Sequence, residues 1–260
     1  MTAMTAANAP GATRAPAPAP ASSAVARWAG AGYLAIFALA IYANFAVRNR
    51  LVVADDPMAT MTAIAGDAST FRLGIAAFTT ITVIDIGIAW ALHQVLRPSG
   101  EQRSLLAAWL RLGYSVIFGA AVTFMAVALH LATGGDAVAG LGDEARAAMT
   151  GTAMEAFDVA WLIGLVVFGL HLIAVGRILV DARLAPRALG WALAVAGTAY
   201  IADTLTHVLL ADYASVADLM LVIVMIPSMV AEMWLTVWLL AGARRATVEA
   251  SRAEPEAVPA

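Results

Sequence analysis

The sequence contains no cysteine and no lysine, and only 13% of its 260 residues are charged. Without thiols the chain cannot form disulfides, thiolate metal sites, cysteine-ligated iron–sulfur clusters or covalently attached c-type haem. Ordinary soluble domains are about 25% charged, whereas 62% of this chain is hydrophobic. This composition indicates that lipid surrounds most of the folded chain. The net charge of −3 and the lack of a basic tract argue against nucleic acid as a partner.

What the sequence has in abundance is long apolar runs. A helix needs about 20 apolar residues to cross the ~30 Å hydrocarbon core of a bilayer. Six runs come near this length, at residues 28–47, 73–96, 105–132, 159–180, 188–210 and 216–241. They are too long for the ~10-residue alternating strands of an outer-membrane barrel, and helices satisfy their own backbone in lipid. We therefore predict an all-α, polytopic membrane bundle of about six transmembrane helices.

The two ends of the chain differ from this apolar region. Residues 1–26 are rich in Ala and Pro, a composition typical of a disordered or polyproline-like tail, and residues 243–260 form a polar tail. The first apolar run is long enough to span, so it is interpreted as a signal anchor and not as a cleaved signal. The predicted transmembrane domain is residues 27–242, and residues 58–64 are a candidate for a short interfacial helix.

The arginines predict the orientation, because positively charged residues gather on the cytoplasmic side. The tails, the 97–104 and 181–187 segments and the adjoining helix ends hold ten: Arg14, Arg27, Arg97, Arg103, Arg177, Arg183, Arg187, Arg244, Arg245 and Arg252. The longer connections, 48–72 and 133–157, hold four: Arg48, Arg50, Arg72 and Arg146. We therefore expect both termini in the cytoplasm of a bacterium and the protein in its plasma (inner) membrane.

A series of short landmarks runs through the apolar region. They are Phe71-Arg72-Leu73-Gly74, Asp85, Leu96-Arg97-Pro98, Phe168-Gly169-Leu170-His171-Leu172, Gly176, Pro186-Arg187-Ala188-Leu189-Gly190, Gly197-Thr198-Ala199-Tyr200-Ile201-Ala202-Asp203, Glu232 and Trp238-Leu239-Leu240-Ala241-Gly242. In this order and spacing, from about residue 30 to 242, the chain resembles a bacterial membrane family, domain of unknown function 4386. The resemblance implies a multi-helix inner-membrane protein and supplies no catalytic residues.

Four ionisable residues form a predicted inner layer, from the midplane toward the cytoplasmic side: Asp85, Arg111, His171 and Glu232. A charge near the bilayer centre costs about 2.5–3.5 kcal/mol on insertion scales, so such groups should face the bundle interior and have partners. Since one cation faces two carboxyl groups, either a carboxyl is protonated or a cation or proton is bound. The inner layer is therefore a small-ligand site or proton relay, or else a structural network in which Arg111 neutralises Glu232 or Asp85 and His171 bridges them.

Four further residues form a predicted outer layer, toward the external face: His130, Asp158, Asp203 and His207. Asp203 and His207 are spaced i, i+4 and so share a helix face. Together with His130 and Asp158 they would make a tetrahedral zinc site, at which an open position activates water. A bis-histidine haem on His130 and His207 is a further alternative. The simplest interpretation is polar helix ends in contact with water.

The function predicted from these observations is that of a non-enzymatic membrane protein. It would bind or pass a small ligand or protons through a polar-lined bundle interior, or assist a membrane process, with the lipid bilayer as its surroundings. The chain has no ATP-binding motif, no thiol nucleophile and no G-x-S-x-G elbow, which are common in pumps and hydrolases. The alternatives are an intramembrane metal-dependent hydrolase using the outer layer and zinc, and a structural or partner-binding bundle.

Overall fold

A computed structural model describes residues 23–242, and within this range the chain forms helices and short connections but no strand. Six helical runs of the described part are long and apolar enough to cross a membrane: Ser23–Leu51, Ala68–Ser99, Glu101–Thr133, Asp143–Asp181, Arg187–Leu209 and Ala217–Ala241. The predicted all-α class with six spans is confirmed. The predicted tails lie outside the described residues, except 23–26, and so do Arg14, Arg244, Arg245 and Arg252.

The elements follow one another with short connections. They are α1 (Ser23–Ile41), a π-helical segment (Tyr42–Arg48), α2 (Asn49–Leu51), α3 (Pro57–Gly66), α4 (Ala68–Leu96), a 3-10 turn (Arg97–Ser99), α5 (Glu101–Thr133), a 3-10 turn (Asp136–Val138), α6 (Asp143–Asp181), α7 (Arg187–Leu209), a 3-10 turn (Tyr213–Ser215), α8 (Ala217–Val237) and a final π-helical segment (Trp238–Gly242). The α1 run is thus continued by the π-helical segment and α2 into one span.

Helices occupy more of the predicted external connections than the sequence indicated. The helix α6 begins at Asp143, so the 133–157 connection shrinks to residues 134–142. The extra turns are helical because they bury one face, including Ala147 and Met154, against α3 and α5. The candidate helix at 58–64 is present as α3, whose first turn is capped by Asp56 accepting from the Ala59 N–H at 2.8 Å.

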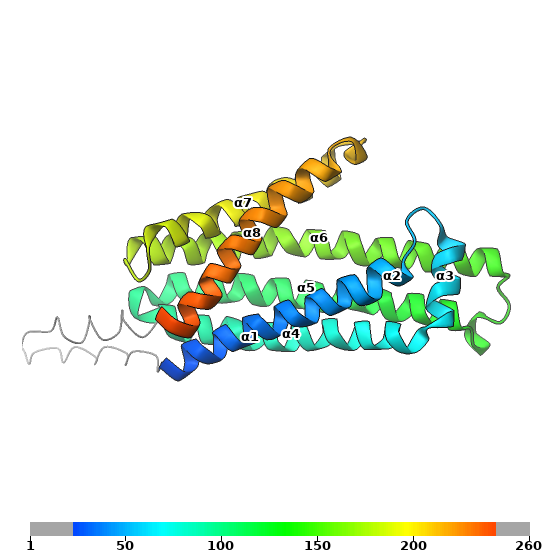
Figure 1. The fold of residues 1–260 in the computed structure, drawn as a ribbon, viewed down its shortest axis with the longest axis horizontal. Coiled ribbons are helices and arrows are strands. Elements are labelled where there is room, and N and C mark those ends of the chain that lie inside the picture. The colour runs from blue at the N-terminus through cyan, green and yellow to red at the C-terminus, as the bar shows by residue number, and fades with distance from the viewer. Residues whose placement is uncertain (1–22, 243–260) are drawn as a thin grey trace, which may run out of the picture.

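The long helices α4, α5 and α6 lie side by side, α1 packs on α4, and α7 packs on α6 (Figure 1). The helix α8 packs on α7 and crosses the bundle so that its C-terminal end reaches α1. At that crossing Leu240 lies against Gly30, where an added Cβ would stand 2.7 Å from Leu240 Cγ. Both ends of the described chain therefore lie at the same end of the bundle, as six spans require.

Two clusters of buried apolar side chains make up the core. One is built around Tyr33, Leu92 and Leu172 near the end with the termini, and the other around aromatic residues such as Phe78 and Phe157 nearer α3. The buried ion-pair residues Asp85 and Arg111 fall where the two clusters meet. On α4, for example, Asp85 lies between Ile81 of the second cluster and Ile88 of the first. The fold thus holds a polar layer between two apolar ones.

Candidate functional site

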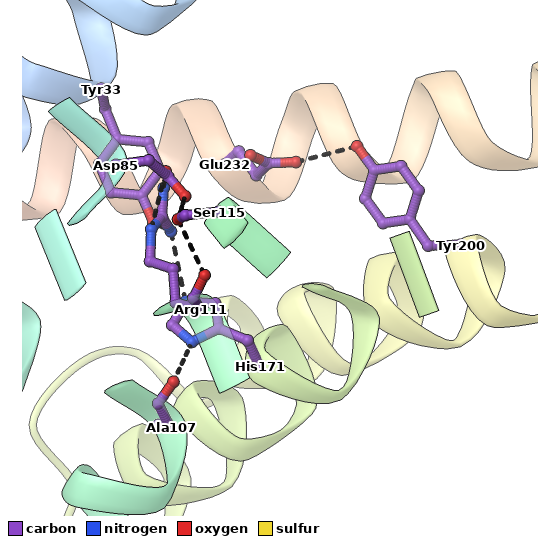
Figure 2. Close-up of polar contacts among 8 residues, drawn as sticks. All are labelled: Tyr33, Asp85, Ala107, Arg111, Ser115, His171, Tyr200 and Glu232. Atoms are coloured by element: carbon purple, nitrogen blue, oxygen red, sulfur yellow. Dashed lines mark hydrogen bonds and ion pairs between the residues drawn. The ribbon is translucent and has the colours of Figure 1, made fainter. Parts of the chain in front are cut away.

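An ion pair between α4 and α5 stands at the centre of the bundle. Arg111 and Asp85 are only 2% and 3% exposed. Arg111 donates from Nε and from Nη2 to Asp85 Oδ1, at 3.0 and 2.5 Å (Figure 2). The second carboxylate oxygen, Oδ2, accepts from Ser115 Oγ at 2.6 Å, and Ser115 lies one helical turn after Arg111. A buried pair is tolerated only when its remaining donors and acceptors are satisfied in this way.

The remaining partners of Arg111 come from α1 and α6. Its Nη1 donates to Tyr33 Oη at 2.5 Å and to His171 Nε2 at 3.3 Å. His171 Nδ1 lies 2.8 Å from the carbonyl oxygen of Ala107. Since a carbonyl oxygen only accepts, the proton of the neutral imidazole is on Nδ1, and the lone pair of Nε2 faces Arg111. Three predicted inner-layer residues, Asp85, Arg111 and His171, are thus brought into one network.

The fourth inner-layer residue, Glu232 of α8, is bonded differently. Its Oε1 accepts from Tyr200 Oη of α7 at 3.1 Å (Figure 2). No hydrogen bond joins the Glu232 carboxyl to Arg111 or Asp85, and within residues 23–242 no Arg or His forms an ion pair with it. Because Arg111 is already paired with Asp85, Glu232 is the inner-layer carboxyl group that has no cation as its partner.

A cavity of about 220 Å³ lies beside this network. Every spanning helix contributes to its lining: Tyr33, Ile36, Phe37, Ala40, Ile81, Asp85, Arg111, Tyr114, Trp161, Leu165, Phe168, Tyr200, Ser228, Met229 and Glu232. The buried indole N–H of Trp161 has no hydrogen-bond acceptor in the described part of the chain. Two polar groups on the cavity wall therefore have no hydrogen-bond partner among the described residues: the Trp161 indole N–H and the second carboxyl oxygen of Glu232.

The two halves of α8 differ in how far they are buried. The buried residues of α8 all come at or after Ser228, whereas its first half exposes large apolar side chains such as Leu221 and Ile226. Figure 1 shows this first half leaning away from α1, on which α8 packs only toward its other end. These exposed apolar side chains indicate that the first half of α8 faces the hydrocarbon of the bilayer.

The outer-layer residues do not form a single site. Asp158 forms an ion pair with Arg48, whose guanidinium also lies 4.8 Å from the ring centre of Phe157. Asp203 accepts from Tyr213 Oη at 2.7 Å, and the His207 ring packs on that same tyrosine. Among residues 23–242 no group of three or more His, Asp or Glu side chains is arranged to hold a metal ion. The four residues of the zinc hypothesis, His130 included, therefore do not form a coordination sphere in the described part of the chain.

The sequence does not identify two residues that contact the predicted site residues, Arg48 and Tyr33. Arg48 was assigned to a connection, but the first helical run extends through Leu51 and places its guanidinium on Asp158. Tyr33 was not singled out, because a tyrosine in an apolar run carries no charge. Its position in the first apolar run, residues 28–47, could have identified it. A tyrosine O–H that is buried among apolar side chains needs a polar partner.

The fold and the site define a multi-pass membrane protein whose six helices enclose a polar, cavity-bearing centre. A family model described as Domain of unknown function (DUF4386) matches residues 28–242, and the chain belongs to this family, as its landmarks indicated. No curated protein and no solved structure matches the chain.

Proposed function

We propose that this protein resides in the bacterial inner membrane and binds a small ligand in the cavity beside Arg111. The observation that carries the proposal is Glu232, a carboxyl group on the cavity wall with Tyr200 as its hydrogen-bond partner and no paired cation among the described residues. A structural network accounts for Asp85, Arg111 and His171, which satisfy one another. It does not account for Glu232 or for the space next to it.

The competing function, passage of protons, is supported less well by the hydrogen bonds. A proton relay needs a chain of donors and acceptors from one face of the membrane to the other. Among the described residues, the series of hydrogen bonds that starts at the Glu232 carboxyl ends after one bond, at the Tyr200 hydroxyl. Ligand binding needs only the cavity and its polar groups, and ligand sites between the helices of a bundle are common.

The proposal is tested by filling the cavity from α1. Ala40→Trp places an indole where Ala40 lines the cavity, whereas Ile41→Trp adds the same group at the next residue, which is 56% exposed and faces outward. Small molecules and lipids that co-purify with each full-length protein are then identified by mass spectrometry. We expect the wild type and Ile41→Trp to retain a molecule that Ala40→Trp lacks. Identical profiles in three equally well-folded proteins would contradict the proposal.

A further inference from the structure

We propose that the ligand of this cavity is a small organic cation with an apolar body, held by Glu232 and by the surrounding aromatic rings. This inference rests on the proposed function, because it specifies the chemical class of the ligand that the cavity takes. It follows from the charge balance of the site and from the size and side chains of the cavity.

With both carboxyl groups ionised, the charges of the site lack one cation. Arg111 is balanced by Asp85 through two hydrogen bonds, and His171 is neutral because its Nε2 accepts from the Arg111 guanidinium, which can only donate, while its one proton is on Nδ1. The carboxyl of Glu232 is then the single surplus acid among the residues that line the cavity. A positively charged ligand would neutralise it at a depth where an isolated charge is costly.

An anionic ligand is disfavoured by the same geometry. The guanidinium of Arg111 already donates four hydrogen bonds, two to Asp85 and one each to Tyr33 and His171. A carboxylate or phosphate in the cavity would compete with those partners and would also lie near Glu232. Arg111 therefore acts as a fixed part of the wall and not as the group that receives the ligand.

The walls of the cavity favour a cation of organic type. Six aromatic side chains line it: Tyr33, Phe37, Tyr114, Trp161, Phe168 and Tyr200. The faces of such rings attract cations, and aromatic cages bind ammonium groups in this way. Two of these rings already contact a cation, since the Arg111 guanidinium carbon lies 4.6 Å from the Tyr33 ring centre and 5.4 Å from that of Phe168.

A bare metal cation fits these walls less well. Calcium and magnesium need about six or more oxygen ligands, and the uncharged oxygens on the wall belong to hydroxyl groups such as Tyr200 and Ser228. The Ser228 hydroxyl is engaged with the Val224 carbonyl at 2.6 Å. At about 220 Å³ the space is also below the ~300–1,000 Å³ of drug-sized pockets, so the ligand is small.

The test compares three probes of similar shape on the purified full-length protein in lipid nanodiscs. They are benzyltrimethylammonium, its neutral isostere neopentylbenzene, and the anion benzylsulfonate, each followed by equilibrium dialysis. We expect the cation to bind about tenfold or more tighter than the neutral isostere, the difference that a desolvated cation–π and charge contact supplies. Glu232→Gln should abolish that difference, while Glu155→Gln, an exposed carboxyl of α6 outside the cavity, should keep it.

Each outcome decides between the two proposals. If the neutral isostere binds as tightly as the cation and Glu232→Gln changes neither, the cavity takes ligands but the cation inference is overturned. If no probe binds but Ala40→Trp loses a co-purifying molecule, the charge of that molecule decides: a cation supports the inference, and a neutral or anionic molecule overturns it. If no probe binds and Ala40→Trp loses nothing, ligand binding itself is refuted.

Discussion

At the residue scale, Arg111 shows why an arginine stands at the centre of this bundle. Its planar guanidinium serves Asp85, Tyr33 and His171 at once, in three different directions. A lysine has three donors on one small ammonium group and cannot reproduce this fork. The arrangement also separates two kinds of carboxyl group: both oxygens of Asp85 accept hydrogen bonds, whereas Glu232 accepts through Oε1 alone.

We predict that the pair between Arg111 and Asp85 behaves as a unit. Arg111→Met leaves a buried carboxylate without its cation, and breaking a buried pair in this way costs about 3–5 kcal/mol of unfolding free energy. The double variant Arg111→Met/Asp85→Leu removes both charges and should be more stable than Arg111→Met alone. Unfolding in mixed detergent micelles, followed by circular dichroism, measures the wild type, the single variants Arg111→Met and Asp85→Leu, and the double variant. If the two single changes simply add in the double variant, the two residues are not coupled.

At the element scale, the backbones of α6 and α7 approach each other closely. Two pairs of glycines face each other there, Gly169 with Gly197 and Gly176 with Gly190, and a Cβ added to Gly169 would lie 2.5 Å from the Gly197 carbonyl oxygen. Small residues let membrane helices approach closely, which increases dispersion contacts where the hydrophobic effect is absent. This contact positions α7, and with it Tyr200, opposite Glu232 of α8.

We predict that Gly169→Ala separates these helices. The new methyl group meets backbone, which cannot rotate away, so overpacking should cost about 1–3 kcal/mol. Gly140→Ala is the matched control, because nothing lies within 4 Å of a Cβ at that position. Thermal unfolding of the purified proteins should show a lower midpoint for Gly169→Ala alone. Equal unfolding midpoints for the two variants would contradict the prediction, because α7 would then accommodate the methyl group without a loss of stability.

The start of α4 supplies a prediction on pH. Hydrogen bonds from the Thr70 side chain and backbone N–H lower the pKa of Asp67, the N-cap of α4, below its ordinary value of 3.8. Because the folded pKa is the lower one, the cap stabilises the fold above pH 3.8, and this contribution is lost as the pH falls through the folded pKa. Asp67→Ala should lower the unfolding midpoint at neutral pH, and the gap to the wild type should narrow in acid. A gap independent of pH would exclude the charged cap as its cause.

At the scale of the whole molecule, the described chain has its two ends together and its α3 region at the opposite end (Figure 1). The turn after α4, which holds Arg97, lies at the end with the termini, and the α5–α6 connection lies beside α3. The arginine distribution predicts that the end with the termini is cytoplasmic. The absence of cysteine makes this orientation directly measurable, since any introduced thiol is unique.

We predict opposite labelling of two single-cysteine variants. Gly140→Cys, in the connection between α5 and α6, should react with a membrane-impermeant maleimide in intact spheroplasts. Ser99→Cys, between α4 and α5, should react only after the membrane is lysed, because the predicted orientation puts Ser99 on the cytoplasmic side. Labelling is read as a mass shift of the purified protein. The reverse pattern would invert the orientation while leaving the fold unchanged.

The sequence by itself determined the number of spans, the helical class and the identity of the inner-layer residues. These are local properties, because an apolar run of sufficient length must be helical in lipid and a charge inside it must face inward. Only the tertiary structure decided the partners. Arg111 pairs with Asp85 and not with Glu232 because packing sets how far each helix is rotated about its axis. The same packing pairs Asp158 with Arg48, and among residues 23–242 the outer layer forms no metal-binding group. The cavity beside Glu232 likewise arises from the crossing of α8 over its neighbours, which no single helix encodes.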